Sequence, residues 1–316
     1  MSENERGVTR RKFIRIAALA SAGAALTPSV LSAPEEQAKE GQAKPAAPPA
    51  PSPQPPSSAR AKVVLVRDKA AVDANGALNA AVLARMLDEA VCALAGDEKP
   101  AEAWCRFFGP KDAAGIKTNV WKFLATPPEV EEILKKRIAA CGVPGGAIRV
   151  TDRAARTELA SCTALLNVRP VRTHHWAGVG GCVKNYIMFV EDPSAYHPDS
   201  CADLGAIWNL PIVKGKTRLN VLLALTPQFY RRGPHSFDPR YVWNYGGMFV
   251  SRDPVAVDAL GAELLRLKRL EVFGEDRPVT PSIHVQMADT RHGVGVGDLK
   301  RIDLARLGWQ EKTLLA

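Results

Sequence analysis

Strand-like and helix-like segments alternate from residue 62 onward, and this order constrains the fold more than any other feature of the sequence. KVVLVR (62–67) has the apolar, β-branched character of a buried strand, and an amphipathic helix pattern follows from about Ala77 to Ala95. Further strand patterns lie at residues 113–120, 147–152, 164–169, 219–227 and 247–253. Alternation of this kind predicts a single α/β domain with a mainly parallel central sheet and helices on both faces. The segment 219–227 is the most apolar strand, so we expect it at the centre of the sheet.

Several predicted strands finish in polar or charged residues. These residues are Lys117 and Asn119, Asp152, Arg169 and Asp253. In open α/β sheets ligands bind beyond the carboxyl ends of the strands, so we expect a polar cleft there. Lys117 and Asn119 share a face of their strand, and a strand interior favours neither residue type. Asp253 also has a simpler interpretation, as the N-cap of the helix that follows it, and Thr126 is expected to cap another helix in the same way.

The run RTHHWAGVGGCVKNYIMF (172–189) combines adjacent histidines, glycines, a cysteine and a Lys-Asn pair. Its glycines at positions 178, 180 and 181 permit backbone angles and close approaches that other residues do not. If a helix begins at Val183, the free N–H groups at its start would face an anion, and Lys184 would add positive charge. The alternative is a glycine-rich bend with Lys184 in solvent. The spacing matches neither GxxxxGK[ST] nor GxGxxG, so no nucleotide-binding loop is indicated.

A soft-metal site is chemically possible in the same region. Its ligands would be His174 or His175, Cys182, His197 and Cys201. His174 and His175 are neighbours, so on a strand they would point in opposite directions and only one would face the site. Cys182 is also a candidate nucleophile, since a helix start and the nearby Lys184 would lower the pKa of its thiol.

The spacing of the cysteines excludes several kinds of metal site. The six cysteines contain no CxxC pair, so neither a zinc ribbon nor a ferredoxin-type iron–sulfur loop is present. Most of the cysteines lie in predicted helices or strands, which favours buried thiols over disulfides, although a periplasmic location would permit disulfides. The chain also lacks GxSxG and HExxH, which argues against the commonest hydrolase classes.

The N-terminal residues have the pattern of a protein exported by the twin-arginine machinery. RRKF (10–13) precedes a weakly apolar run that ends near Leu31. Residues 1–33 are therefore predicted to be a signal peptide, with cleavage after Ser32 preferred to cleavage after Ala33. The apolar run is too short and too rich in Ala and Gly to favour a permanent membrane span. We expect a periplasmic protein, or one anchored to the cytoplasmic membrane if the signal is not cleaved.

Composition separates a linker from the folded part of the chain. Residues 34–60 are dense in Pro, Ala and Ser and carry almost no large apolar side chain, so we expect a disordered linker before an α/β domain at 61–316. The formal net charge is +9, is spread along the sequence and is accompanied by few aromatic residues. This pattern argues against a nucleic-acid partner and favours a small anion or an acidic envelope surface.

Several motifs together resemble the domain-of-unknown-function family 362. They are GIKTN (115–119), VRPVRTHHWAGVGGCVKNYIMF (168–189) and FVSRDPVAVDALGAELL (249–265), and DLGAIWNLP (203–211) is similar to the family's helix before the central strand. The resemblance covers residues 62–270. It implies a shared site at the family's polar positions: Lys117, Asn119, His174, Lys184, Asn185, Asp253 and Asp258.

The chain also departs from the family pattern. Arg172 stands where members usually have Lys, and the central strand ends LTPQF, where many members have an acidic-Gly turn with a carboxylate suited to a metal. Many relatives carry ferredoxin-like cysteine clusters that this chain lacks, so the resemblance implies no iron–sulfur cofactor here. Asp258 has a simpler interpretation as a surface charge. The family has no settled activity to transfer, and the sequence leaves open whether the chain is an enzyme.

These observations give one leading hypothesis and two alternatives. The leading hypothesis is an exported protein whose cleft binds a small anionic ligand, with or without a divalent metal. Three cations would attract the ligand: Lys117, Arg172 and Lys184. Asn119 and Asn185 would orient it, and His174 and Lys184 are the candidate catalytic residues, with His174 as acid, base or metal ligand. The alternatives are a tethered, non-catalytic binding or chaperone module and a thiol redox protein that uses Cys182.

Overall fold

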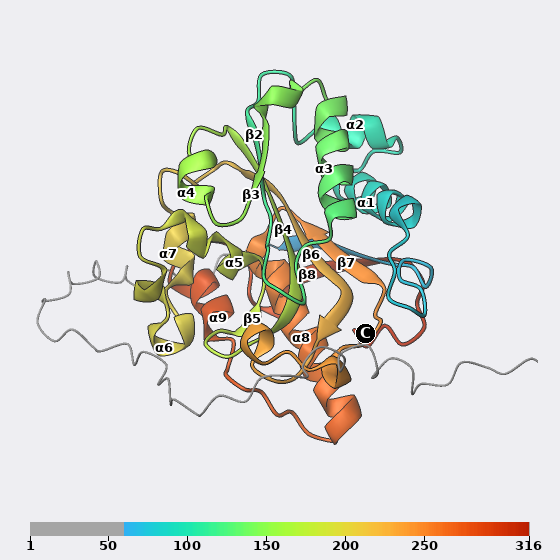
Figure 1. Ribbon diagram of the computed structural model, residues 1–316, viewed down its shortest axis with the longest axis vertical. Helices are drawn as coiled ribbons and strands as arrows, with labels where there is room; N and C mark the ends of the chain where they lie inside the picture. The colour runs from blue at the N-terminus through green and yellow to red at the C-terminus, as the bar shows by residue number, and fades with distance from the viewer. Residues whose placement is uncertain (1–59, 316) are drawn as a thin grey trace, which may run out of the picture. The chain divides into compact units, whose positions relative to one another are not determined.

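The computed structural model describes residues 60–315, which form one mixed sheet covered by helices (Figure 1). The strand bounds are β1 Ala61–Arg67, β2 Ala114–Lys117, β3 Ile148–Thr151, β4 Ala164–His174, β5 Gly178–Gly180, β6 Thr217–Gln228, β7 Gly247–Ser251 and β8 Ile302–Gly308. Their order in the sheet is β3-β2-β4-β6-β7-β1-β8, and β5 pairs with β4. The apolar segment 219–227 therefore lies in the central strand, as predicted. The predicted signal peptide at 1–33 and nearly all of the predicted linker at 34–60 lie outside the described residues.

The sheet is mostly parallel, as predicted, but β7 and β5 run against their neighbours. The pairs β2·β3, β2·β4, β4·β6 and β1·β8 are parallel, whereas β7 is antiparallel to both β1 and β6. The segment 229–246 between β6 and β7 contains two short 3-10 helices and no crossover helix, so the chain returns in the opposite direction. The carboxyl end of β7 therefore lies at the sheet edge opposite to the carboxyl ends of β2, β3 and β4.

Helices cover both faces of the sheet. Their bounds are α1 Ala80–Ala95, α2 Pro100–Cys105, α3 Pro128–Ala140, α4 Ala155–Glu158, α5 Cys182–Asn185, α6 Pro198–Cys201, α7 Leu204–Trp208, α8 Pro254–Phe273 and α9 Ile283–Thr290. Figure 1 shows α1, α2 and α3 together on one side, away from α7 and α9. Among the residues that the structure describes, no helix is long and apolar enough to cross a membrane.

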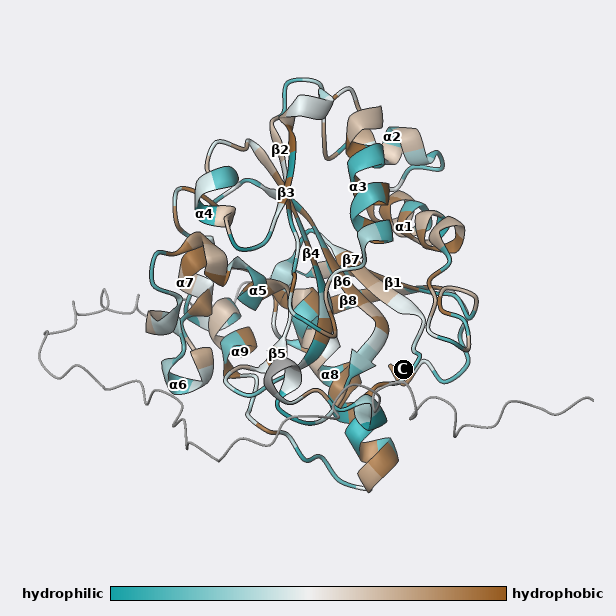
Figure 2. Ribbon diagram, viewed as in Figure 1, coloured by the Kyte–Doolittle hydropathy of each residue, from teal (hydrophilic) through white to brown (hydrophobic). Residues whose placement is uncertain are grey.

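Alternate residues of the strands enter two separate apolar cores. Val63 and Leu65 of β1 face the core that includes side chains of α7, α8 and α9. Val64 and Val66 face the other core, which includes side chains of α1, α2 and α3. Figure 2 shows both apolar and polar residues on α3, as expected for a helix with one buried face. The prediction of a sheet with helices on both faces is confirmed.

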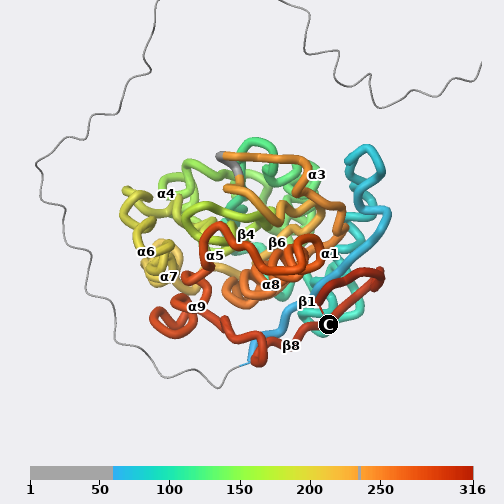
Figure 3. The backbone as a smooth tube through the Cα atoms, turned by 90° about the horizontal axis from the view of Figure 1, so that it is seen from below, coloured from blue at the N-terminus to red at the C-terminus, as the bar shows by residue number. Residues whose placement is uncertain are grey.

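The two ends of the described chain meet in one strand pair. Residues 61–67 and 302–308 run side by side and parallel (Figure 3). The Arg67 guanidinium lies 4.1 Å from the ring centre of Tyr245 and 4.3 Å from that of Trp309, and its Nε donates to the Tyr245 carbonyl at 3.0 Å. Backbone pairing and these cation–π contacts together hold the C-terminal segment on the first strand.

Asp253 is the N-cap of α8. Its Oδ1 accepts hydrogen bonds from Val255 N at 2.8 Å and from Ala256 N at 2.9 Å, and its Oδ2 accepts from Val296 N at 2.8 Å. Because β7 is antiparallel, this carboxylate also lies at the sheet edge opposite to Lys117. The structural interpretation of Asp253 therefore holds, and its expected membership of the cleft is wrong.

Thr126 does not cap a helix, contrary to the prediction. The helix α3 begins at Pro128, with Pro127 at the N-cap position and no side-chain cap. Thr126 Oγ1 instead accepts a hydrogen bond from Asn119 N at 3.1 Å. The hydroxyl therefore closes the loop after β2, which leads to the polar residues at that strand end.

Cys105 and Cys141 form a disulfide that joins the end of α2 to the end of α3. The free cysteines are Cys92, Cys162, Cys182 and Cys201. The preference for thiols over disulfides is thus wrong for one pair. Its members are 36 residues apart and meet only because α2 and α3 pack on the same face of the sheet, which spacing along the chain does not reveal.

Thiol titration of the denatured protein tests this disulfide. Without reductant we expect four reactive thiols per chain, and six after reduction. Reduction should also lower the free energy of unfolding by about 2–4 kcal/mol, because the bond restrains the unfolded chain. A Cys105→Ser/Cys141→Ser double variant is the control and should show four thiols under both conditions. Six thiols before reduction, in protein isolated from an oxidising compartment, would contradict the pairing.

Candidate functional site

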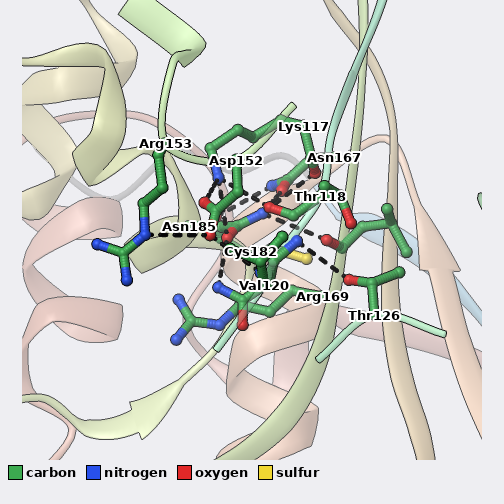
Figure 4. Close-up of polar contacts among 12 residues, drawn as sticks. Lys117, Thr118, Val120, Thr126, Asp152, Arg153, Asn167, Arg169, Cys182 and Asn185 are labelled. Carbon is green, nitrogen blue, oxygen red and sulfur yellow. Dashed lines mark hydrogen bonds and ion pairs between the residues drawn. The ribbon is translucent and has the colours of Figure 1, made fainter. Parts of the chain in front are cut away.

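The ends of β2 and β3 bring a lysine and an aspartate into direct contact. The parallel register places Lys117 opposite Thr151, the residue before Asp152. Lys117 Nζ lies 2.5 Å from Asp152 Oδ1 and donates to the Thr118 carbonyl at 2.8 Å. Lys117 and Asp152 are both buried. Figure 4 shows these two side chains pointing toward each other, with Asn185 beside them.

Asn185 connects this ion pair to the neighbouring strand and to the loop after β2. Its Oδ1 accepts from Lys117 Nζ and from Asn119 Nδ2, both at 3.3 Å. Its Nδ2 donates to Asn167 Oδ1 at 2.8 Å and to the Lys117 carbonyl at 3.2 Å. Both polar atoms of the amide are therefore used within the protein, and Asn185 holds three segments of the chain in one arrangement.

The N–H groups at the start of α5 face a carboxylate of the protein itself. Asp258 of α8 accepts from Cys182 N at 2.5 Å and from Val183 N at 2.8 Å. Gly181 permits this contact, because a Cβ there would lie 2.2 Å from Asp258 Oδ1. Burial raises the pKa of Asp258 to about 7, although both backbone bonds favour the carboxylate. The N–H groups that were expected to bind an external anion therefore bind Asp258 instead. Asp258 is buried, so its interpretation as a surface charge is wrong.

A cavity of about 160 Å³ lies beside this network, and we name it the strand-end cavity. Its lining consists of Asn119, Trp121, Asp152, Arg153, Arg169, His174, Trp176, Lys184, Asn185, Ile187, Met188, Pro193 and His197. Five candidate site residues are among them: Asn119, His174, Lys184, Asn185 and His197. Asp152 and Arg169, predicted as polar strand ends of the cleft, also line it. The predicted residues that do not line the cavity are Lys117, Arg172, Cys182, Cys201, Asp253 and Asp258.

Positive charge predominates in this lining. Arg153, Arg169 and Lys184 are cationic, whereas Asp152 is the one carboxylate. Asp152 is paired with Lys117, and its other oxygen lies 3.8 Å from Arg153 Nε. Among residues 60–315, neither Arg169 nor Lys184 has a carboxylate oxygen within 4.0 Å. Buried charge without a counter-charge is costly, so a bound anion would stabilise this part of the structure.

A larger cavity of about 720 Å³ between α8 and α9 has a different electrostatic character. Its arginines are paired with acids in the same lining, for example Arg269 with Asp276 at 2.6 Å and Arg266 with Glu263 at 2.6 Å. Because these charges already compensate each other, the groove offers no comparable attraction for an ion. The smaller, cationic cavity is the better candidate for a functional site.

Two arginines of β4 have different surroundings. Arg169 lines the strand-end cavity, its Nη1 donates to the Gly181 carbonyl at 3.3 Å, and its buried Nε has no partner in the described part of the chain. Arg172 lies outside the lining, where it donates to the Leu124 carbonyl and to Asn119 Oδ1, both at 2.9 Å. Figure 4 shows the Arg169 guanidinium beyond the paired groups of the cluster. Sequence reasoning noted Arg169 as a polar strand end but selected Arg172, because the family motif drew attention to it.

The two buried lysines of this region have opposite surroundings. Burial lowers the pKa of each to about 8. Asp152 stabilises the charged form of Lys117, whereas Arg169 disfavours the charged form of Lys184. The Nζ of Lys184 contacts Cys201 Sγ at 3.7 Å. The charge of Lys117 is therefore compensated within the protein, and that of Lys184 is not.

Three histidines and a tryptophan form an aromatic cluster at the cavity. The ring centres of His174 and His175 lie 4.9 Å apart, and Trp176 lies 3.9 Å from His197. The prediction that His174 and His175 point in opposite directions is wrong, because β4 ends at His174 and strand alternation does not extend beyond it. Trp176 N donates to His174 Nδ1 at 3.2 Å, so a neutral His174 carries its proton on Nε2. Burial and the nearby Lys184 lower the pKa of His174 strongly, which keeps its ring neutral.

The residues considered as metal ligands do not form a ligand group. They are His174, Cys182, His197 and Cys201. Within the described part of the chain, no three His, Cys, Asp or Glu side chains are placed to hold a metal ion. Cys182 is fully buried, and burial raises the pKa of its thiol well above the ordinary value, so its surroundings do not favour a nucleophilic thiolate. The chemistry presented at this edge of the sheet is cationic.

Comparison with known proteins supports the motif resemblance. The sequence pattern of the family described as Domain of unknown function (DUF362) matches residues 116–263. This stretch contains the whole lining of the strand-end cavity and also Asp258. No curated protein and no solved structure matches the chain. The family match therefore spans the candidate site and carries no activity with it.

Replacement of the two buried lysines by methionine should change stability in opposite directions. Lys117→Met leaves Asp152 buried without its partner, and we expect the free energy of unfolding to fall by about 3–5 kcal/mol at neutral pH. Lys184→Met removes a cation without a counter-charge, and we expect a gain of up to about 3 kcal/mol. Chemical denaturation measures both changes, with Lys69→Met at an exposed position as the control. If Lys117→Met and Lys184→Met destabilise the protein equally, the proposed difference between the surroundings of the two lysines is wrong.

The pH dependence separates this electrostatic effect from a packing effect. The pKa of Lys184 in the folded protein, about 8, lies below its ordinary value of 10.5. The cost of its charge is therefore complete below about pH 8 and disappears as the pH rises to 10.5. The stability advantage of Lys184→Met should shrink across this interval. An advantage that stays constant there would show that better packing, and not the removal of charge, explains it.

Proposed function

We propose that this protein binds a small anion in the strand-end cavity, with a carboxylate or phosphate group directed at Arg153, Arg169 and Lys184. The observation that carries the proposal is the excess of positive charge in the lining. Unpaired buried cations lower the stability of a fold. Proteins commonly keep such destabilising charges only where they serve a function. The proposal includes neither a metal nor thiol chemistry, because the described residues form no ligand group and Cys182 is inaccessible.

The dimensions of the cavity limit the ligand. A volume of about 160 Å³ is small for a ligand pocket, so the cavity suits a short organic acid better than a nucleotide. Apolar and aromatic side chains form another part of the wall: Trp121, Trp176, Ile187 and Met188. Such a wall favours a ligand with a charged group at one end and a short apolar or planar body.

The proposal extends to where the protein acts, which we place outside the cytoplasm. The RRKF pattern at 10–13 supports recognition by the twin-arginine machinery. The disulfide between Cys105 and Cys141 supports an oxidising compartment, since such bonds rarely persist among cytosolic proteins. An exported domain behind a Pro/Ala-rich linker would meet small anions from the surroundings of the cell.

Titration calorimetry of the purified full chain tests the anion site. The probes are phosphate, sulfate, acetate, lactate and pyruvate, and at least one should bind with an affinity that falls as ionic strength rises. Arg153→Ala should weaken that binding by about tenfold to a hundredfold, because a charged hydrogen bond is lost. The Arg153 side chain is 58% exposed, so this variant should fold.

Arg156→Ala provides the matched control. Its side chain is 46% exposed and pairs with Glu191, and Arg156 does not line the cavity. We expect its affinity for the anion to equal that of the wild type. Failure of all five probes to bind at millimolar concentration, or equal weakening by Arg153→Ala and Arg156→Ala, would contradict the proposal.

A further inference from the structure

Lys184 combines three properties that a lysine acting only as a charge does not need. Its side chain is buried, it lines the strand-end cavity, and it has no carboxylate partner in the described part of the chain. Its pKa falls to about 8, chiefly because of burial; Arg169 also lowers it, and the contact with Cys201 opposes both effects. A lysine beside another cation in a desolvated pocket is partly a free amine near neutral pH, and the free amine is a nucleophile.

Building on the proposed anion site, we infer that Lys184 forms an imine with the carbonyl carbon of a short oxo acid whose carboxylate lies against Arg153 and Arg169. The lone pair of Nζ adds to the carbonyl carbon while the oxygen takes a proton, which gives a carbinolamine. The hydroxyl group then leaves as water, and the C=N bond forms. One amine and one carbonyl are exchanged for one imine and one water, so the step needs neither an oxidant nor a reductant.

The shape and charge of the cavity favour this substrate class over a simple anion. Its volume of about 160 Å³ is small, which suits a short acid such as pyruvate. Among the described residues Arg169 has no carboxylate within 4.0 Å, and the exposed Arg153 has only a long 3.8 Å contact with Asp152, so both can turn to the carboxylate of a ligand. The amine of Lys184 is then left for a second functional group of the same molecule. A simple inorganic anion would use the charge of Lys184 but not its nucleophilicity.

Lys117, the other buried lysine of this region, shows which property of Lys184 the inference depends on. Its pKa is also lowered to about 8. However, its Nζ donates to Asp152, to the Thr118 carbonyl and to Asn185, and it does not line the cavity. A low pKa is therefore present at both lysines, whereas access to a ligand is present only at Lys184.

Reductive trapping of the full-length protein tests the imine. The protein is incubated with pyruvate and sodium cyanoborohydride, which reduces an imine much faster than a free carbonyl, and peptide mass spectrometry locates the product. We expect one adduct per chain at Lys184, at a rate that rises as the pH approaches about 8, and none at Lys117. Lys184→Met should lower labelling at least tenfold, and the exposed-site control Lys69→Met should not change it.

Lactate is the matched probe, because it has the carboxylate and the size of pyruvate but no carbonyl group. It should bind, slow the trapping of pyruvate at Lys184 and form no adduct. If pyruvate binds in calorimetry and Arg153→Ala weakens it, but Lys184 stays unlabelled, the imine is wrong and the anion site stands. Labelling spread over exposed lysines without preference for Lys184 overturns the inference as well. If pyruvate neither binds nor labels while phosphate or sulfate binds, the oxo-acid class is wrong and the proposed function survives.

Discussion

The contact between Asp258 and the start of α5 is the interaction on which the candidate site depends. It attaches α8 to the turn that carries Lys184 and Asn185, and it gives partners to two buried backbone N–H groups. Gly181 makes this close approach possible. Asn185 reaches both β2 and β4 only because the turn is held in this position. A residue that contributes no surface to the cavity therefore determines its geometry.

The buried polar residues divide into a satisfied group and an unsatisfied one. Lys117, Asp152 and Asn185 bond to one another, and a complete network of this kind holds the strand ends in a single geometry. Arg169 and Lys184 have no carboxylate oxygen within 4.0 Å among the described residues. The carboxylates that favour the charge of Arg169 are the more distant Asp152 and Asp258. Burying Arg169 and Lys184 without a nearby carboxylate lowers the free energy of unfolding at this one place. Binding and catalytic sites commonly carry such a cost. The larger groove at α8 and α9 shows no such imbalance, since its arginines are paired.

The fold was largely predictable, and the site was predictable where it depends on strand direction. Polar residues at the ends of β2, β3 and β4 converge because those strands are parallel, which alternation with helices indicates. Asp253 was wrongly predicted to lie at the cleft, because no local sequence pattern indicates that β7 runs antiparallel to its neighbours. The partner of Asp258 and the disulfide depend on packing between distant segments, which a single sequence does not encode in its spacing. Arg172 was preferred to Arg169 because it stands at the basic position of the family motif, and periodicity does not tell which β4 residue borders a cavity.

The lining of the strand-end cavity comes from one continuous stretch, residues 119–197, which is about a quarter of the chain. The strands β1, β6, β7 and β8 and the helices α1, α8 and α9 supply no part of it. Substitutions that change the lining of the cavity therefore fall within one continuous stretch, and the strands and helices outside it need not change with them.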